Sequence, residues 1–92
     1  MYARVASFEG GDTEKLRQMG EEGGTPDPPL GVKRVLLLGD DTGTRRLFIT
    51  FFDSLEDIEA SKERFERMGD EISEDVRGRR TSVDVYEVLF EQ

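Results

Sequence analysis

One short segment, Arg46 to Phe52, constrains the fold of this chain more than any other feature. Its sequence, RLFITFF, is apolar at almost every position. If it is a β-strand, side chains on both of its faces need to be buried, because successive strand residues point to opposite faces of a sheet. A chain of 92 residues has enough helix to cover one face. We therefore expect a second copy of the chain to cover the other.

Length and composition set the next limits. Residues 1–92 are expected to form a single domain, which buries only about 60–65% of the surface of its unfolded chain and so gains from association. No run of 18 apolar residues predicts a membrane span, and the first residues lack the pattern of a signal peptide. A cytoplasmic location is expected.

The residue types that are missing limit the chemistry. The chain contains no Cys, His, Trp or Asn. It therefore has no thiolate nucleophile, no imidazole base, and no ordinary zinc or haem ligand, and no Asp/Glu spacing is typical of a calcium loop. We expect no cofactor and no metal site. Whether the chain is an enzyme stays open.

The charge of the chain bears on its partners. The formal net charge is −8 at pH 7. Binding to phosphate backbones or to anionic lipid surfaces needs a basic face. We therefore expect neither nucleic acid nor membrane as a partner.

The pattern along the chain predicts six main elements. Strands are expected at residues 2–8, 32–38, 45–52 and 81–90, and a helix over 12–22 with Asp12 as its N-cap. A proline-rich loop follows at residues 23–31. The second main helix begins after Ser54 and places Leu55, Ile58, Phe65 and Met68 on one stripe. A further short helix follows Asp70 and ends at Gly78.

This order of elements, strand–helix–strand–strand–helix–strand, is that of the ferredoxin-like α+β fold. In that fold the first and third strands lie at the centre of a four-stranded antiparallel sheet. Right-handed crossovers place the helices on one face. The chain is expected to dimerise through the other face.

Side chains of the expected strands separate by parity into an aliphatic and an aromatic set. The aliphatic set, suited to packing under the helices, is Ala3, Val5, Ser7, Leu47, Ile49, Phe51, Val83, Val85 and Leu89. The aromatic set is Tyr2, Arg4, Ala6, Phe8, Phe48, Thr50, Phe52, Asp84, Tyr86, Val88 and Phe90. Aromatic faces with a few polar groups are typical of interfaces and ligand cavities. The candidate dimer interface is therefore Phe8, Phe48, Phe52 and Phe90; alternatively, Phe48 and Phe52 are ordinary core residues beneath the helices.

Three segments carry a resemblance to a known group of proteins. Residues 2–10 (YARVASFEG), 31–38 (GVKRVLLL) and 83–88 (VDVYEV) look like the dimeric α/β-barrel superfamily. Within it, nearly the whole chain is most similar to small proteins grouped with the antibiotic-biosynthesis monooxygenase domain. The resemblance implies that the sheets of two copies pair face to face into a closed barrel. It implies a small-molecule-binding or monooxygenase-like protein, although enzymatic branches typically use Asn, Trp or His at the site.

Four residues of the aromatic set are the candidate ligand-binding site for a small aromatic ligand: Arg4, Thr50, Asp84 and Tyr86. Arg4 would anchor a carboxylate through two hydrogen bonds, Tyr86 would donate to a carbonyl, and Asp84 would act as a base. No catalytic residue is assigned. Alternatively, Arg4 and Asp84 form a cross-strand ion pair and Tyr86 only packs.

Two other functions remain as alternatives. The strand Arg46 to Phe52 and residues 53–57 resemble part of an RNA-recognition motif, a module that stacks bases on exposed aromatic side chains. The glycines of that motif are missing, and the net charge has the wrong sign. The other alternative is a non-catalytic ligand-sensing or structural dimerisation module. Fold alone does not separate such a module from an enzyme.

Overall fold

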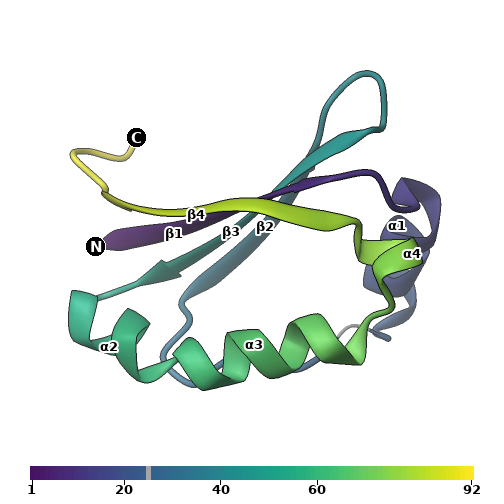
Figure 1. Cartoon of the computed structure of the whole chain (residues 1–92). Coiled ribbons are helices and arrows are strands. Elements are labelled where there is room, and N and C mark those ends of the chain that lie inside the picture. The colour runs from purple at the N-terminus through teal and green to yellow at the C-terminus, as the bar shows by residue number, and fades with distance from the viewer. Residues whose placement is uncertain (25) are drawn as a thin grey trace.

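The computed structural model describes residues 1–24 and 26–92, and Thr25, within the expected loop, lies outside them. The described elements are β1 (Tyr2–Glu9), α1 (Thr13–Glu22), β2 (Arg34–Gly39), β3 (Arg45–Phe52), α2 (Leu55–Ala60), α3 (Lys62–Glu71), α4 (Glu74–Arg77) and β4 (Arg79–Glu87) (Figure 1). They follow the expected order, with the region after β3 divided into three helices.

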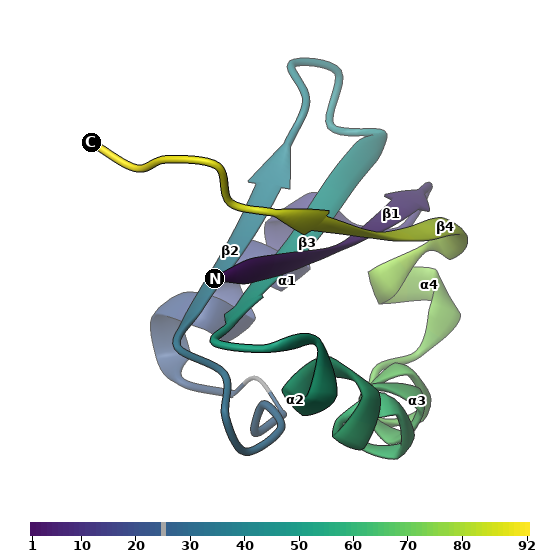
Figure 2. The same cartoon turned by 90° about the vertical axis from the view of Figure 1, so that its left-hand side faces the viewer.

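The four strands form one antiparallel sheet in the order β2-β3-β1-β4. The central strand β1 pairs with both β3 and β4, so that Val5 lies opposite Ile49 on one side and Asp84 on the other. The helices lie on one side of the sheet, with α3 running below it and α1 at one end (Figures 1 and 2). The predicted four-stranded α+β fold is confirmed, and its strand order is compatible with the ferredoxin-like fold.

Two helices begin where the sequence predicts. Asp12 caps α1 by accepting a hydrogen bond from the Lys15 backbone N–H at 3.0 Å. Ser54 caps α2 in the same way, accepting from the Asp57 N–H at 3.2 Å. A side-chain oxygen at this position satisfies one of the N–H groups that the first turn of a helix leaves unpaired.

The helix expected after Ser54 is divided at Ser61. The Ser61 hydroxyl donates to the Asp57 carbonyl at 2.8 Å, and its backbone N–H bonds to the Ile58 carbonyl at 3.1 Å. Such a bond back along the helix competes with the regular backbone pattern. The chain therefore changes direction between α2 and α3, and the apolar stripe still reaches the sheet through Ile58 and Phe65.

The core beneath the helices is small. Phe52 is fully buried and meets the Phe65 ring edge-on, with ring centroids 6.1 Å apart, and Ile58 completes the cluster. Two rings that meet edge-to-face at this separation attract one another, and this attraction adds to the stabilisation from the area they bury. Tyr2 and Phe48 pack at the margin of this cluster. The core thus lies over one end of the central strands, where Phe52 pairs with Tyr2.

The expected assignment of strand faces is wrong for β1 and β3. The register pairs Arg4 with Thr50 and Ala6 with Phe48, and this set of residues faces the helices. The opposite side of the sheet, which no described helix covers, is called here the open face. It consists of Ala3, Val5, Ser7, Arg34, Leu36, Leu38, Leu47, Ile49, Phe51, Ser82, Asp84 and Tyr86. Because β3 is apolar at both parities, alternation along the strand could not reveal which set faces the helices.

The bounds of the last strand, β4, differ from those expected from the sequence. Val83 and Val85 lie on the helix side, as expected, since they pair with Ala6 and Arg4. β4 begins at Arg79, earlier than expected, and ends at Glu87. The prediction that Phe90 belongs to this strand is therefore wrong; the ring lies beyond it and is 79% exposed.

Candidate functional site

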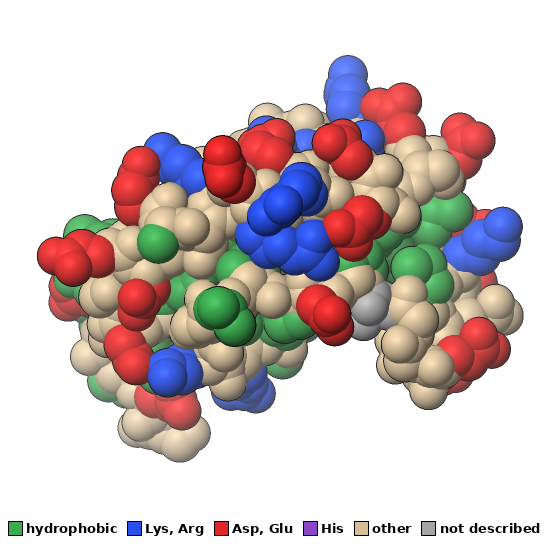
Figure 3. Space-filling model, turned by 90° about the horizontal axis from the view of Figure 1, so that it is seen from below, with side chains coloured by type: hydrophobic (Ala, Val, Ile, Leu, Met, Phe, Trp, Pro, Cys, Tyr) green, Lys and Arg blue, Asp and Glu red, His purple; other side chains and the backbone are tan. Residues whose placement is uncertain are grey.

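A cavity of about 710 Å³ lies between the sheet and the helices. Its apolar lining comes from the sheet, from α1, from α3 and from the loop before β2: Ala6, Phe8, Val35, Leu37, Phe48, Leu16, Met19, Phe65, Met68, Ile72, Pro26 and Pro28. From the helix side, hydrophobic side chains are visible between the acidic and basic ones (Figure 3). Both the volume and the apolar lining are typical of small-molecule sites.

The sequence explains why this space is left open. Helix α1 directs only Leu16 and Met19 toward the cavity, and the next residue, Gly20, adds no side chain. On the sheet, Val35 and Leu37 of the edge strand β2 remain 43% and 47% exposed. Two short helices with narrow apolar stripes cannot fill the volume beneath a twisted four-stranded sheet.

Charged side chains also reach the cavity. Among the described lining residues are four arginines, at positions 4, 46, 77 and 80, and two acids, Glu66 and Asp70. The cavity is therefore locally cationic in a chain whose net charge is −8. Clefts lined by one sign of charge concentrate ions of the opposite sign.

Arg46 uses its guanidinium to hold the structure together. It is 3% exposed, and one nitrogen donates to the Thr13 hydroxyl at 2.9 Å. The other terminal nitrogen donates to the carbonyls of Gly10 and Arg77. These bonds join β3 to the start of α1 and the end of α4. A buried cation whose two terminal nitrogens are both directed at oxygen atoms is stable without any ligand.

Arg77 and Arg80 also have partners. The Arg77 Nε donates to the carbonyls of Gly69 at 2.8 Å and Ile72 at 3.1 Å, which closes the turn between α3 and α4. Arg80 lies 3.4 Å from a carboxylate oxygen of Glu66, and both side chains are partly exposed. Exposed pairs at this distance contribute little to stability.

Arg4 differs from the other three arginines. It is 8% exposed, and its guanidinium carbon lies 3.8 Å from the centroid of the Phe65 ring. Within residues 1–24 and 26–92, neither a hydrogen bond nor an ion pair engages its nitrogens. Burial, and then the charge of Arg80, lower the pKa of Arg4 to about 10, so it remains charged at neutral pH. The Arg4 guanidinium thus lies at the cavity without a hydrogen bond from the described residues, and its nitrogens keep some access to solvent. The charge of Glu66 acts on the pKa of Arg4 in the opposite direction to that of Arg80.

Thr50 lies directly opposite Arg4 in the register of β1 and β3. It is fully buried, and its hydroxyl has no hydrogen-bond partner among the described residues. Thr50 does not line the cavity itself. Of these two adjacent polar side chains, the Thr50 hydroxyl is therefore the one buried without a partner, which is rare.

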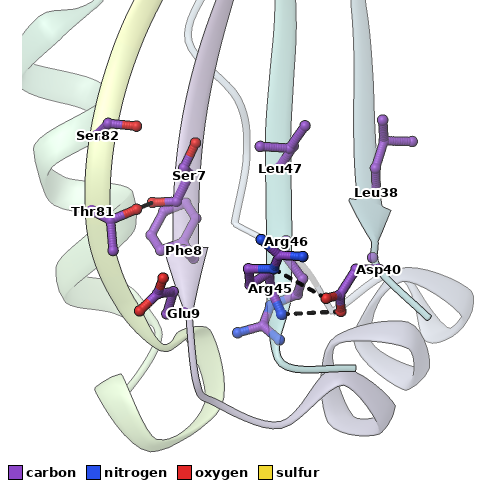
Figure 4. Close-up of a pocket in the computed structure, with 11 residues that line it drawn as sticks. Ser7, Phe8, Glu9, Leu38, Asp40, Arg45, Arg46, Leu47, Thr81 and Ser82 are labelled. Atoms are coloured by element: carbon purple, nitrogen blue, oxygen red, sulfur yellow. Dashed lines mark hydrogen bonds and ion pairs between the residues drawn. The ribbon is translucent and has the colours of Figure 1, made fainter. Parts of the chain in front are cut away.

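A shallower depression of about 550 Å³ lies at one end of the open face. Ser82, Ser7, Leu47 and Leu38 lie side by side there, one from each strand (Figure 4). Its rim includes a paired charge, since Arg45 lies 3.2 Å from Asp40. The depression is open and its polar groups are small, so it is the weaker of the two candidates.

Asp40 at that rim stabilises the β2–β3 turn. Its carboxylate accepts hydrogen bonds from the backbone N–H groups of Arg45 and Thr44 and from the Thr42 hydroxyl. The Arg45 N–H and then the Thr42 hydroxyl lower the pKa of Asp40 to about 2. The Asp40 carboxylate therefore has its hydrogen-bond partners within the turn and needs no ligand to pair with it.

The structure divides the four residues of the expected ligand site. Arg4 and Thr50 lie on the helix side, whereas Asp84 and Tyr86 lie on the open face. The alternative ion pair between Arg4 and Asp84 is wrong for the same reason, because Asp84 pairs with Val5 and points the other way.

The residues expected at the dimer interface also lie away from the open face. Phe8 and Phe48 line the cavity, and Phe52 is in the core. The alternative that Phe48 and Phe52 pack beneath the helices is therefore confirmed. Phe90 follows β4 in the exposed C-terminal segment.

Sequence reasoning missed Arg46, Glu66 and Arg80 as cavity residues. For Arg46 a signal existed, since it shares the parity of Phe48 at the start of an apolar strand. Nothing in the spacing of Glu66 and Arg80 shows that α3 and β4 bring them together.

The described residues include no group of three or more acidic side chains placed to hold a metal ion. Within the same residues, each helix is too short or too polar to cross a membrane. Comparison with protein families and with curated proteins finds no match to this chain.

Proposed function

We propose that this chain is a small-molecule-binding protein of the dimeric α/β-barrel type, similar to small antibiotic-biosynthesis-monooxygenase-domain proteins. Each copy binds an apolar ligand between its sheet and its helices, and two copies pair through their open faces. The observation that carries the proposal is the cavity of about 710 Å³ with an unpaired arginine in its wall. Apolar walls with a few oriented polar groups are the usual composition of ligand sites.

The open face supports pairing with a second copy. Leu38 and Leu47 are 45% and 38% exposed there, next to the apolar side chains of Leu36, Ile49 and Phe51. A contiguous apolar patch of this kind marks an interaction site, and a domain this small gains stability by covering it.

The charges at the edges of the open face favour a twofold arrangement. Arg34 lies on the edge strand β2, and Asp84 lies on the opposite edge strand β4. A twofold axis parallel to the strands brings the β2 edge of one copy over the β4 edge of the other. Arg34 of each copy then approaches the edge that carries Asp84, which makes the face complementary to itself.

The position of the aromatic side chains weakens the RNA-binding alternative. An RNA-recognition surface stacks bases on aromatic rings at the centre of the open face. Here the central positions of β1 and β3 on that face are Val5, Leu47 and Ile49, and the aromatic residues Phe51 and Tyr86 lie toward one end, on either side of Ala3. The net charge of −8 also disfavours a polyanion.

Ligand binding is favoured over catalysis by the groups in the cavity. Its described titratable side chains are four arginines, which can orient an anion, together with Glu66 and Asp70, and they include no nucleophile–base pair. Thermal unfolding in the presence of aromatic acids and quinones tests the proposal. We expect a higher melting temperature with at least one of these compounds and no turnover under oxygen. Turnover of a phenolic compound would instead assign a monooxygenase, and no stabilisation by any of them would contradict the cavity as a binding site.

Light scattering tests the dimer. We expect twice the monomer mass of 10.5 kDa at micromolar concentration. A folded species of monomer mass would contradict pairing through the open face.

A further inference from the structure

We propose that the ligand of this cavity is an apolar monocarboxylate, which binds Arg4 and Arg80 and displaces Glu66 from Arg80. This inference rests on the proposed function and adds the chemical class of the ligand and the residues that select it. It starts from Arg4, a largely buried cation of the cavity to which the described residues offer no hydrogen-bond acceptor.

An unpaired buried guanidinium is unfavourable in the empty protein. Removing a cation from water costs several kcal/mol, and an attractive partner must offset that cost. The Phe65 ring offsets part of it, because the guanidinium lies 3.8 Å from the ring centroid. Stacking uses the face of the guanidinium and leaves its N–H edges unused. An oxyanion inside the cavity would engage those edges.

The shape of the guanidinium selects a planar anion. A carboxylate accepts two parallel hydrogen bonds from one edge of an arginine, which gives both affinity and orientation. With Phe65 against one face of Arg4, a carboxylate in the guanidinium plane places its substituent in the cavity. That substituent would then contact Phe48, Met19 and Met68. The rest of the ligand is therefore expected to be apolar, and an aromatic ring fits these neighbours.

Arg80 supplies the second cation. It lies close enough to Arg4 for its charge to contribute to the lowered pKa of Arg4. Its present partner is Glu66, whose Oε1 lies 3.4 and 3.5 Å from the two terminal nitrogens of Arg80. Charge-assisted hydrogen bonds are normally about 2.7–2.9 Å long, so this pair is loose. Glu66 is 69% exposed and can turn to solvent when another carboxylate takes its place.

Glu66 and Asp70 limit the charge of the ligand. Both acids lie at the lining of the cavity, next to the arginines. A single carboxylate replaces the contact that Glu66 gives up. A second negative charge on the ligand would meet the two acids without a further unpaired arginine to bind it, since Arg46 and Arg77 are already used. Monoanions are therefore preferred over dianions.

Isothermal titration calorimetry with two matched probes tests this inference. 1-Naphthoate carries the carboxylate, and 1-naphthamide has nearly the same shape without the charge. We expect the wild-type protein to bind 1-naphthoate at least about tenfold more tightly, since hydrogen bonds to charged groups are worth about 1.5–3 kcal/mol. This comparison needs no variant, so it does not depend on how a mutant folds.

Variants then assign the residues. Arg4→Met should reduce the affinity for 1-naphthoate toward that for 1-naphthamide, with Arg80 retaining part of the difference, and Glu66→Gln should increase the affinity for 1-naphthoate about threefold by removing the competing carboxylate. Glu63→Gln, on the same helix but outside the cavity lining, is the matched control and should leave both affinities unchanged.

The outcomes separate this inference from the proposed function. Equal affinity of the wild-type protein for both probes would overturn the carboxylate while leaving the cavity as a binding site. Unchanged or weaker binding of 1-naphthoate by Glu66→Gln would overturn the displacement of Glu66. Binding of neither probe, nor of any compound in the thermal screen, would contradict the proposed function itself.

Discussion

Phe52 and Leu47 belong to the same strand, β3, but to opposite faces of the sheet. Phe52 is completely buried against Ile58 and Phe65, whereas Leu47 is 38% exposed on the open face. Both faces are apolar, and they differ in what covers them. The helix side has a small core and an unfilled cavity beside it. No described helix covers the open face (Figures 1 and 2), so the two faces are suited to the different roles proposed for them, ligand binding and pairing.

The largest effect is expected at the core of the helix side. Phe52→Ala should lower the free energy of unfolding by about 3–5 kcal/mol, because it removes a fully buried ring and leaves a void. Urea denaturation measures this change. Leu55→Ala, at a side chain that is 53% exposed, is the control and should change stability far less. Similar losses for the two variants would mean that the Phe52 ring is not a core residue.

The next effect concerns a buried arginine of the helix side that has partners. Arg46→Met should lower the free energy of unfolding by about 2–3 kcal/mol, because it removes several hydrogen bonds from a buried cation, and hydrogen bonds to charged groups are worth about 1.5–3 kcal/mol. Thr13 and the Gly10 carbonyl are among the acceptors of these bonds. Urea denaturation beside Arg45→Met, an exposed neighbour on β3, measures the difference. A loss no greater than that of the control would contradict the structural role of Arg46.

A pair of lysine substitutions compares the two faces directly. Leu47→Lys places a charge on the open face, and Val83→Lys places one on the helix side at a residue with nearly the same exposure, 40% against 38%. We expect Leu47→Lys to weaken the dimer by at least about tenfold, or about 1.4 kcal/mol, because it buries a charge in the interface. Val83→Lys should leave the dimer intact. Light scattering over a range of concentrations measures both, and the reverse result would assign pairing to the helix side.

Arg4→Met should change the free energy of unfolding in the opposite direction to Arg46→Met. Replacing a buried cation that has no partner by an apolar side chain of similar length should raise the free energy of unfolding by about 1 kcal/mol. Thermal and urea unfolding without ligand measure this. A loss of stability as large as that of Arg46→Met would show that Arg4 is held by the protein itself.

The smallest expected effect is at the β2–β3 turn, away from both surfaces. The pKa of Asp40 is about 2 in the folded chain against 3.8 for a free side chain. Since the folded pKa is the lower one, the stabilisation is present above pH 4 and is lost as the pH falls toward 2. Urea unfolding at a series of pH values should show a shallower acid loss for Asp40→Asn than for Asp41→Asn. Equal pH profiles would contradict the role of the carboxylate.

Much of this arrangement could be predicted from the sequence. The order of elements, the N-caps Asp12 and Ser54, and the apolar stripe through Ile58 and Phe65 follow from local chemistry. The assignment of faces could not be predicted for β3, because both of its parities are apolar. Alternation therefore carries no information there, and only contacts with α2 and α3 decide it.

The candidate site could be predicted only in part. Arg4 was identified as a carboxylate anchor because it is a polar member of the aromatic set, and the structure places it in a cavity without a hydrogen bond from the described residues. Its expected companions Asp84 and Tyr86 lie on the other face. The actual neighbours, Phe65 and Arg80, come from α3 and β4, and their approach depends on how the helices lie on the sheet. No local pattern encodes that placement.

The three methionines of the chain allow the central claim to be tested in one measurement. Met19 and Met68 line the cavity, and Met1 lies outside its lining. In a protein labelled with ¹³C at the methionine and leucine methyl groups, 1-naphthoate should shift the Met19 and Met68 signals through the ring current of the bound naphthalene. The Met1 signal should remain in place. The contradicting result would be unchanged Met19 and Met68 signals together with saturable shifts at Leu38 or Leu47 of the open face. It would mean that the ligand does not bind between the sheet and the helices.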